Sequence, residues 1–147
     1  KSHNAEVCAE ESSSIVSLSE LRKWLHQQTV EQSVLLLSQE ASSLIEVDGD
    51  KALALLKRAE RLQPQSAMIH YNMGCVLASQ GKLSEAETAF SQAIQLDDRM
   101  AEAYFNRAVA ALLHNNNIKA IADLSKAGEL GLYRAYNLIK QAQKQQH

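Results

Sequence analysis

The stretch that decides the fold is AMIHYNMGCVLASQGKLSEAETAFSQAIQLDDRM, residues 67–100. Moved forward by 34 residues, it falls on residues 101–134, and the same interval recurs along the chain. The sets of residues that repeat at this interval are Ala67, Ala101 and Ala135; Ala52, Ala86 and Ala120; Leu56, Phe90 and Leu124; Ala59, Ala93 and Ala127; and Leu62, Leu96 and Leu130. A fixed period of this length, in which each copy reads as two short helices, predicts a solenoid of stacked helix-turn-helix units.

Each copy reads as a pair of helices that pack closely. Residues 68–80 carry helical apolar spacing, and Gly81 follows where a left-handed C-terminal cap is needed. Gly74 is a small residue at a position where two helices must approach each other, as are Ala86 and Ala93 in the second helix. Phe90 is the large side chain expected to fill the remaining gap between them.

Helix starts are predicted from capping signals. A Ser or Thr followed three residues later by Glu or Gln is a capping box, because each side chain accepts an otherwise unpaired backbone N–H. We predict helix starts from the boxes at residues 17–20, 29–32 and 84–87. Asp97 and Asp98 are expected to cap the helix that follows them.

These spacings resemble those of the tetratricopeptide repeat family. The second copy matches the family pattern at Tyr71, Asn72, Gly74, Gly81, Leu83, Ala86, Phe90 and Ala93. The third copy keeps Tyr104, Phe105, Asn106, Ala108, Ala120, Leu124 and Ala127, and the first keeps Ala52, Leu56, Ala59, Leu62 and Pro64. The resemblance implies an all-α, right-handed α-solenoid of about three helix-turn-helix repeats, with an extra N-terminal helix and a C-terminal capping helix.

The predicted boundaries follow from the copies. We expect a disordered tail over residues 1–16, a helix over 17–28, repeats over 29–66, 67–100 and 101–134, and a capping helix over 132–147. In the first copy, which is the most diverged, alignment on Gly49 puts Ser42 in the slot of Gly74. Gly128 inside the last repeat is expected to mark a close approach of two helices.

Composition excludes several classes of function. The 147 residues carry a net charge of −2 and 46% hydrophobic residues, which is typical of a globular domain and gives no general attraction to nucleic acid. No apolar run is long enough for membrane insertion. The chain starts at Lys1, not Met, so we expect a processed form or a piece of a longer protein, and its compartment stays unknown.

No pattern in the sequence predicts catalysis, a cofactor or a metal. There is no glycine-rich phosphate loop, nucleophile elbow or zinc-protease helix. The five histidines do not pair with one another, with cysteine or with a carboxylate at ligand spacing. The two cysteines, Cys8 and Cys75, are not expected to form a disulfide. We therefore predict that the chain is not an enzyme.

The resemblance places the candidate site on the concave side, which the first helix of each repeat lines. The residues at the groove positions are Met68, Tyr71, Asn72, Cys75 and Ser79 in copy two, Glu102, Phe105, Asn106, Val109 and Leu112 in copy three, and Tyr136 and Ile139 in the last helix. An apolar strip edged by amides suits an extended peptide, because amides bind its backbone and the strip takes an apolar side chain. The same residues could equally serve packing alone.

Chaperone-binding members of the family hold a C-terminal carboxylate with lysines, asparagines and an arginine. Asn72 fits one asparagine position, but the cationic positions are unmatched and Glu102 brings the wrong charge to one of them. Without those cations the carboxylate loses its charge-assisted hydrogen bonds. We expect no binding of chaperone tails by that route.

The sequence thus predicts a protein–protein interaction module that binds a peptide segment or a helix of another protein. Self-association is the alternative, either by end-to-end stacking or through the helix that carries Trp24, the only tryptophan. Trp24 is either an exposed anchor for a partner or, as we expect, packed against the next helix.

Overall fold

The computed structural model describes residues 16–145, and within them every regular element is a helix. The described residues divide into two units, 16–33 and 34–145, which are considered separately. The helices are α2 (Leu18–Leu44), α3 (Gly49–Leu62), α4 (Ala67–Ser79), α5 (Leu83–Leu96), α6 (Ala101–Leu113), α7 (Asn117–Glu129) and α8 (Arg134–Lys144).

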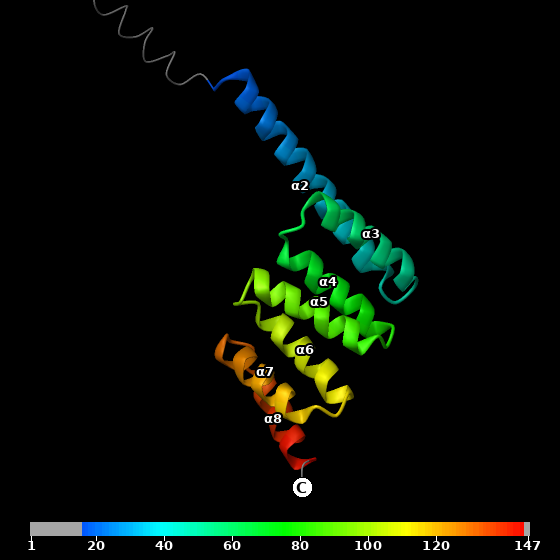
Figure 1. Cartoon of the computed structure of the whole chain (residues 1–147), viewed down its shortest axis with the longest axis vertical. Helices are drawn as coiled ribbons and strands as arrows, with labels where there is room; N and C mark the ends of the chain where they lie inside the picture. The colour runs from blue at the N-terminus through cyan, green and yellow to red at the C-terminus, as the bar shows by residue number, and fades with distance from the viewer. Residues whose placement is uncertain (1–15, 146–147) are drawn as a thin grey trace, which may run out of the picture. The chain divides into compact units, whose positions relative to one another are not determined.

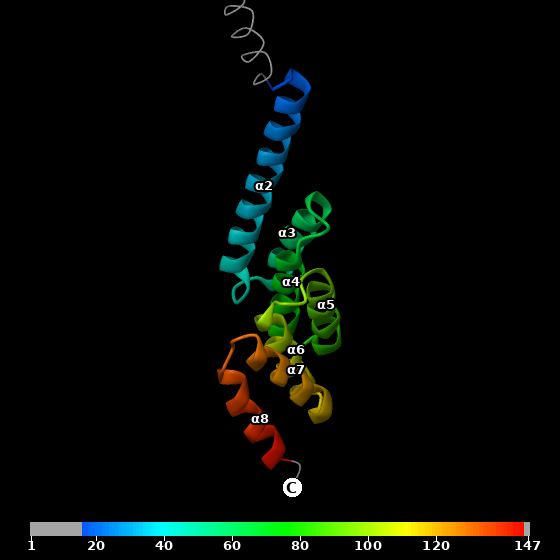
Figure 2. The same cartoon turned by 90° about the vertical axis from the view of Figure 1, so that its left-hand side faces the viewer.

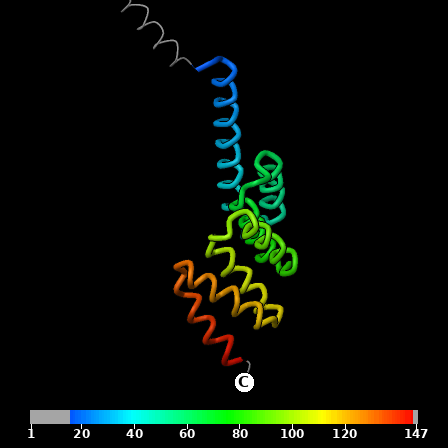
Figure 3. Tube along the Cα trace, turned by 60° about the vertical axis from the view of Figure 1, so that its left-hand side comes forward, coloured from blue at the N-terminus to red at the C-terminus, as the bar shows by residue number. Residues whose placement is uncertain are grey.

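The second unit is a stack of helical hairpins. Helices α3 to α8 follow one another along the stack (Figure 1), and each packs against the next one in the chain. In the view turned by 90°, α5 and α8 lie on opposite sides of the stack (Figure 2). The trace in Figure 3 shows the chain reversing direction between successive helices. The predicted all-α helical repeat fold is therefore confirmed.

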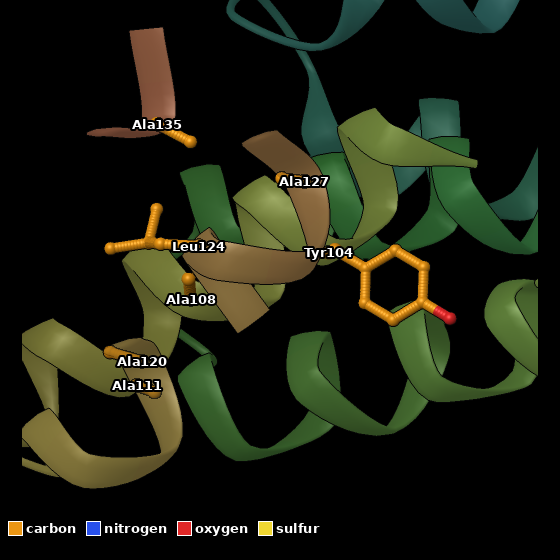
Figure 4. Packing of buried hydrophobic residues seen from close by; sticks show 7 residues of the cluster. All are labelled: Tyr104, Ala108, Ala111, Ala120, Leu124, Ala127 and Ala135. Carbon is orange, nitrogen blue, oxygen red and sulfur yellow. The ribbon is translucent and has the colours of Figure 1, made fainter. Parts of the chain in front are cut away.

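The 34-residue period is the period of the core. The second helix of each repeat contributes a set of two alanines and one leucine or phenylalanine that was predicted to face a neighbouring helix. All members of these three sets are at most 1% exposed. Their members are Ala52, Leu56 and Ala59 in α3, Ala86, Phe90 and Ala93 in α5, and Ala120, Leu124 and Ala127 in α7. Figure 4 shows the third of these sets with Tyr104, Ala108 and Ala111 of α6 and Ala135 of α8.

A small residue lies opposite the large one in every repeat. A Cβ added to Gly74 would lie 2.5 Å from Cε1 of Phe90, so the ring occupies the space that any side chain there would need. In the repeats that carry leucine, the opposing residue is alanine, with Ala41 and Leu56 sharing one cluster. Ala108 and Leu124 share another. The size of one side chain thus sets the size of the other.

Gly128 has the same explanation at the C-terminal end. A Cβ at Gly128 would lie 2.5 Å from Cζ of Tyr136 in α8, so the predicted close approach is confirmed. Helix α8 buries Ala135 and Ala142, while most of its remaining residues are polar and exposed. This is the arrangement expected of a helix that closes a solenoid.

A left-handed residue follows the end of α4, as predicted. Gly81 has a φ of 76°, its N–H donates to the Ala78 carbonyl at 3.0 Å, and the Lys82 N–H donates to the Leu77 carbonyl at 2.9 Å. This pair of bonds is a Schellman motif. Asn115, with a φ of 61°, forms the equivalent turn one repeat later.

One predicted boundary is wrong, because α2 runs without a break where two helices were expected. An N-cap residue needs non-helical backbone, but Thr29 is helical and its hydroxyl donates to the Leu25 carbonyl at 2.9 Å. No glycine or proline interrupts the helical hydrogen bonds before Leu44. With no second helix beginning there, the expected packing of Trp24 is also wrong, and its side chain is 58% exposed.

Three smaller predictions also need correction. The box at Ser17 forms, with the Glu20 N–H donating to Oγ of Ser17 at 3.2 Å. The box at Ser84 does not, because α5 already begins at Leu83, directly after the Schellman turn, and Ser84 lies inside its first turn. Asp97 is the C-cap of α5 and not the N-cap of α6, which begins at Ala101. The small slot of the first repeat belongs to buried Ala41, whereas Ser42 is exposed.

An ion pair that the sequence did not suggest joins three helices. The Arg107 guanidinium of α6 donates to both carboxylate oxygens of Asp123 in α7, at 2.8 and 2.7 Å. It also donates to Oγ of Ser91 in α5 at 3.1 Å. The hydrogen bond with Asp123 raises the pKa of Arg107 further, so the guanidinium stays charged. Both side chains are largely buried.

We expect Phe90→Ala to lower the free energy of unfolding by about 3–5 kcal/mol, since the ring fills the joint against Gly74. Urea titration followed by circular dichroism measures this loss. Ile118→Ala, at an exposed position of α7, is the matched control and should change stability by less than about 0.5 kcal/mol. A loss below about 1 kcal/mol for Phe90→Ala would contradict the packing.

We expect Asp123→Ala to cost about 2–4 kcal/mol, because it leaves the Arg107 guanidinium largely buried without its acceptor. The double variant Arg107→Met, Asp123→Ala should cost less than the sum of Arg107→Met alone and Asp123→Ala alone, as a double-mutant cycle in urea would show. Additive losses would mean that the two groups do not interact.

Candidate functional site

Side chains of α4 and α6, the first helices of the second and third repeats, meet those of α8 on one surface. We call this surface the A-helix face. It is formed by Tyr71 and Cys75 of α4, Glu102, Phe105 and Asn106 of α6, and Arg134 of α8. Helices α4 and α6 approach each other directly across it. The Asn106 amide donates to the Tyr71 hydroxyl at 2.9 Å and lies 3.8 Å from the Cys75 sulfur. This network fixes the spacing of the two helices.

The other edge of the A-helix face is held by Arg134. Its guanidinium carbon lies 4.8 Å from the centre of the Phe105 ring, and Nη2 donates to the Glu102 carboxylate at 3.0 Å. The arginine side chain stays more than half exposed. Cation–π stacking and an ion pair therefore place two opposite charges, Arg134 and Glu102, at the rim of the A-helix face.

A pocket of about 200 Å³ opens between α4, α5 and α6. Its lining is almost entirely apolar, with a thiol and an amide as the polar groups, and comprises Cys75, Ala78, Leu83, Phe90, Asn106, Val109, Ala110 and Leu113. The buried Phe90 ring that joins the two helices of the repeat is also part of this pocket. The pocket has room for one uncharged side chain of a partner.

Burial decides the ionisation of the two titratable groups in the centre. Burial raises the pKa of the Cys75 thiol, and the negative charge of Glu102 raises it further. Burial likewise raises the pKa of the Tyr71 hydroxyl well above its ordinary value. Both groups are neutral at physiological pH, so they act as hydrogen-bonding and packing groups.

The structure brings together six of the twelve predicted groove residues, as a network of Tyr71, Cys75 and Asn106 with Val109 beside the pocket, and Glu102 and Phe105 at the rim. Of the others, Met68 and Ser79 are exposed and Asn72 is partly buried. Leu112 and Ile139 pack against the core of α6 and α7. Tyr136 lies over Gly128, with 43% of its surface exposed.

Sequence reasoning missed Arg134 and several pocket residues. Arg134 is the first residue of α8 and lies 32 residues after Glu102. Because this is close to the repeat length, it occupies nearly the same place in its helix as Glu102 does in α6, which is the signal that could have found it. Leu83 and Leu113 lie near helix ends, where the pattern of a single helix does not show which pocket they line.

Two further observations concern metals and membranes. In residues 16–145, no three histidine, cysteine or acidic side chains lie close enough together to hold a metal ion. His70 is buried, with Nε2 3.3 Å from the Pro64 carbonyl oxygen. None of the helices described here combines the length and apolarity needed to span a bilayer.

The stacked hairpins and the surface on their first helices define a helical-repeat protein of the kind that serves as a protein-interaction module. A family model described as tetratricopeptide repeat matches residues 48–86 and 71–130. The chain belongs to the tetratricopeptide repeat family, and this fold is generally that of a non-enzymatic interaction module.

Individual relatives agree with this assignment. The chain is 35% identical over 66 residues to neutrophil cytosol factor 2 of Bos taurus, a match covering 45% of this chain and 12% of that protein. The Arabidopsis OM64 TPR domain has a TM-score of 0.74 at 18% identity, covering 79% of this chain and 98% of that one. The first TPR of Spaghetti (RPAP3), bound to the HSP90 peptide SRMEEVD, has a TM-score of 0.73 at 19% identity, covering 77% and 92%.

We expect Cys75 to react slowly with iodoacetamide, because burial both raises the pKa of the thiol and limits access to it. The measurement is the alkylation rate between about pH 7 and pH 9, by mass spectrometry of a Cys8→Ser variant, against an unstructured cysteine peptide whose thiol has a pKa of about 8.5. A rate equal to that of the free peptide would contradict the buried position.

Proposed function

We propose that this chain is a non-catalytic adaptor that binds a peptide segment or a helix of another protein on the A-helix face, the predicted concave groove. The observation that supports this most is the apolar pocket beside the Asn106 amide, with Asn72 nearby on the same helix as Cys75. The pocket takes one apolar side chain, while amides hydrogen-bond the backbone of the bound segment. Arg134 and Glu102 supply one charge of each sign at the rim.

The chemistry of the site argues against an enzyme. The thiol of Cys75 is the obvious nucleophile in the pocket, but burial keeps it protonated. Its hydrogen-bonding neighbours, Tyr71 and Asn106, are not general bases at neutral pH, since the tyrosine pKa is raised and an amide does not take up protons.

The partner we expect is not a chaperone tail held by its C-terminal carboxylate. Glu102 lies at one position where such a carboxylate would need a cation, and its charge is already compensated by Arg134 at 3.0 Å. A second carboxylate brought to this place would be repelled by Glu102 or would have to displace it. The groove thus favours an uncharged, apolar contact residue over an acidic terminus.

The test compares Tyr71→Ala and Phe105→Ala with the wild-type chain in quantitative pull-downs. Tyr133→Ala is the matched control, because this tyrosine is 74% exposed and lies outside the A-helix face. We expect both groove variants to lose the same binding partners at least tenfold, with helicity retained by circular dichroism, while the control keeps them; a tenfold loss corresponds to about 1.4 kcal/mol.

The peptide SRMEEVD is the specificity control and should show no saturable binding in a calorimetric titration. Partners retained by both folded groove variants would contradict the proposed surface. Saturable binding of the peptide, lost on Arg134→Ala, would contradict the exclusion of acidic tails. Turnover that copurifies with the folded chain through every step would revive an enzymatic role.

A further inference from the structure

Helix α2 carries apolar residues on two sides. Val34 and Ala41 are buried, and Ala41 packs with α3 and α4. Leu25 precedes Val34 by nine residues, which turns its side chain about 180° away from that of Val34 at 3.6 residues per turn. Leu25 and its neighbours therefore lie on a different side of α2 from Val34 and Ala41.

The second side has the spacing of a coiled coil. Its residues follow one another at alternating steps of three and four, all are exposed, and none is charged: Leu18, Leu21, Leu25, Gln28 and Gln32. This alternation is the heptad pattern that brings two helices together along a common seam. Trp24 flanks the seam and is also exposed.

We propose that this seam, residues 18–32 of α2, pairs with the same segment of a second copy of the chain in a parallel, in-register dimer. In this register Leu18, Leu21 and Leu25 meet their own counterparts. Gln28 and Gln32 also meet themselves, so each amide finds a donor and an acceptor. The antiparallel registers that align the seams place leucine opposite glutamine, which buries amides without partners.

The charges of the segment fit a second copy of itself. Glu20 and Glu31 balance Arg22 and Lys23, and all four lie off the seam. In a parallel pair the flanking positions bring Ser17 beside Arg22 of the second copy and Trp24 beside Thr29, so no like charges meet. A segment of balanced charge with an uncharged seam suits self-pairing better than pairing with a strongly acidic or basic partner.

The length of the seam sets the strength of the dimer. Fifteen helical residues extend about 22 Å, at 1.5 Å per residue. A contact of this length buries less surface than the interfaces of obligate dimers, which bury more than about 1,000 Å² per partner. We expect the dimer to form and dissociate with concentration in the micromolar range.

The first test is sedimentation velocity of the full chain from about 1 to 300 µM, a range that brackets micromolar affinity. We expect a monomer–dimer equilibrium in the wild-type chain and a monomer for Leu21→Glu, Leu25→Glu. The matched control Ser19→Glu, Gln27→Glu adds the same charge to the opposite side of the helix and should still dimerise. Circular dichroism verifies that both variants keep their helicity.

A wild-type chain that stays monomeric at every concentration overturns the proposal, whether or not it binds lipid vesicles through the same apolar residues. A dimer that persists in the Leu21→Glu, Leu25→Glu variant overturns it as well, because the contact must then lie elsewhere. Loss of dimerisation in both charge variants would mean that dimerisation depends on the charge of the segment and not on the seam, which also overturns the proposal.

The second test measures orientation. In a Cys8→Ser, Cys75→Ser background, Leu18→Cys should form an intermolecular disulfide rapidly, because in-register seam residues bring their Cα atoms within about 7 Å. Ser19→Cys, one residue away on the outer side, is the control and should cross-link at least tenfold more slowly. Equal rates for the two variants overturn the parallel register.

Discussion

The contact between Gly74 and Phe90 is the constraint on which the rest of the solenoid depends. A ring of this size, fully buried, leaves no space for a side chain opposite it. The other repeats solve the same packing problem with leucine against alanine, and the last joint solves it with Tyr136 against Gly128. Because each pair fixes the distance between two helices, the pairs together fix how the first helices line up, and so which residues form the A-helix face.

Much of this architecture could be predicted because a repeat shows each packing position several times. Ala86, Phe90 and Ala93 were identified as joint residues from their counterparts one period away, and all are buried. The left-handed turn at Gly81 was equally visible, since few residues tolerate that conformation. Helix starts were predicted less well. Thr29 and Ser84 both satisfy the pattern of a capping box, but whether a serine or threonine caps a helix depends on the backbone before it, which the pattern does not contain.

For the candidate site, the sequence found the helices that face one another but not all of the groups that join them. Tyr71, Cys75 and Asn106 were expected on one surface and share a hydrogen-bonding network. Arg134 and Asp123 were not found, because a charged residue in a helical pattern is usually solvated and the partner of each lies in another helix. The two apolar sides of α2 were also missed. Averaged over the whole helix their apolar residues point in opposing directions and cancel, although the spacing on each side is clear when it is considered alone.

The guanidinium of Arg107 has a mechanical consequence for the stack. It is bonded at once to α5 and α7 while it belongs to α6, so it clasps two consecutive repeats together. A load applied to the C-terminus would peel α8 away first, since it is the last described helix of the stack and its one ion pair, Arg134 with Glu102, is exposed. Peeling would then stall at α7, where the clasp has to open before the next hairpin can follow. The solenoid would therefore not yield evenly along its length, because the hairpins joined by Arg107 would resist unfolding more than the C-terminal helix.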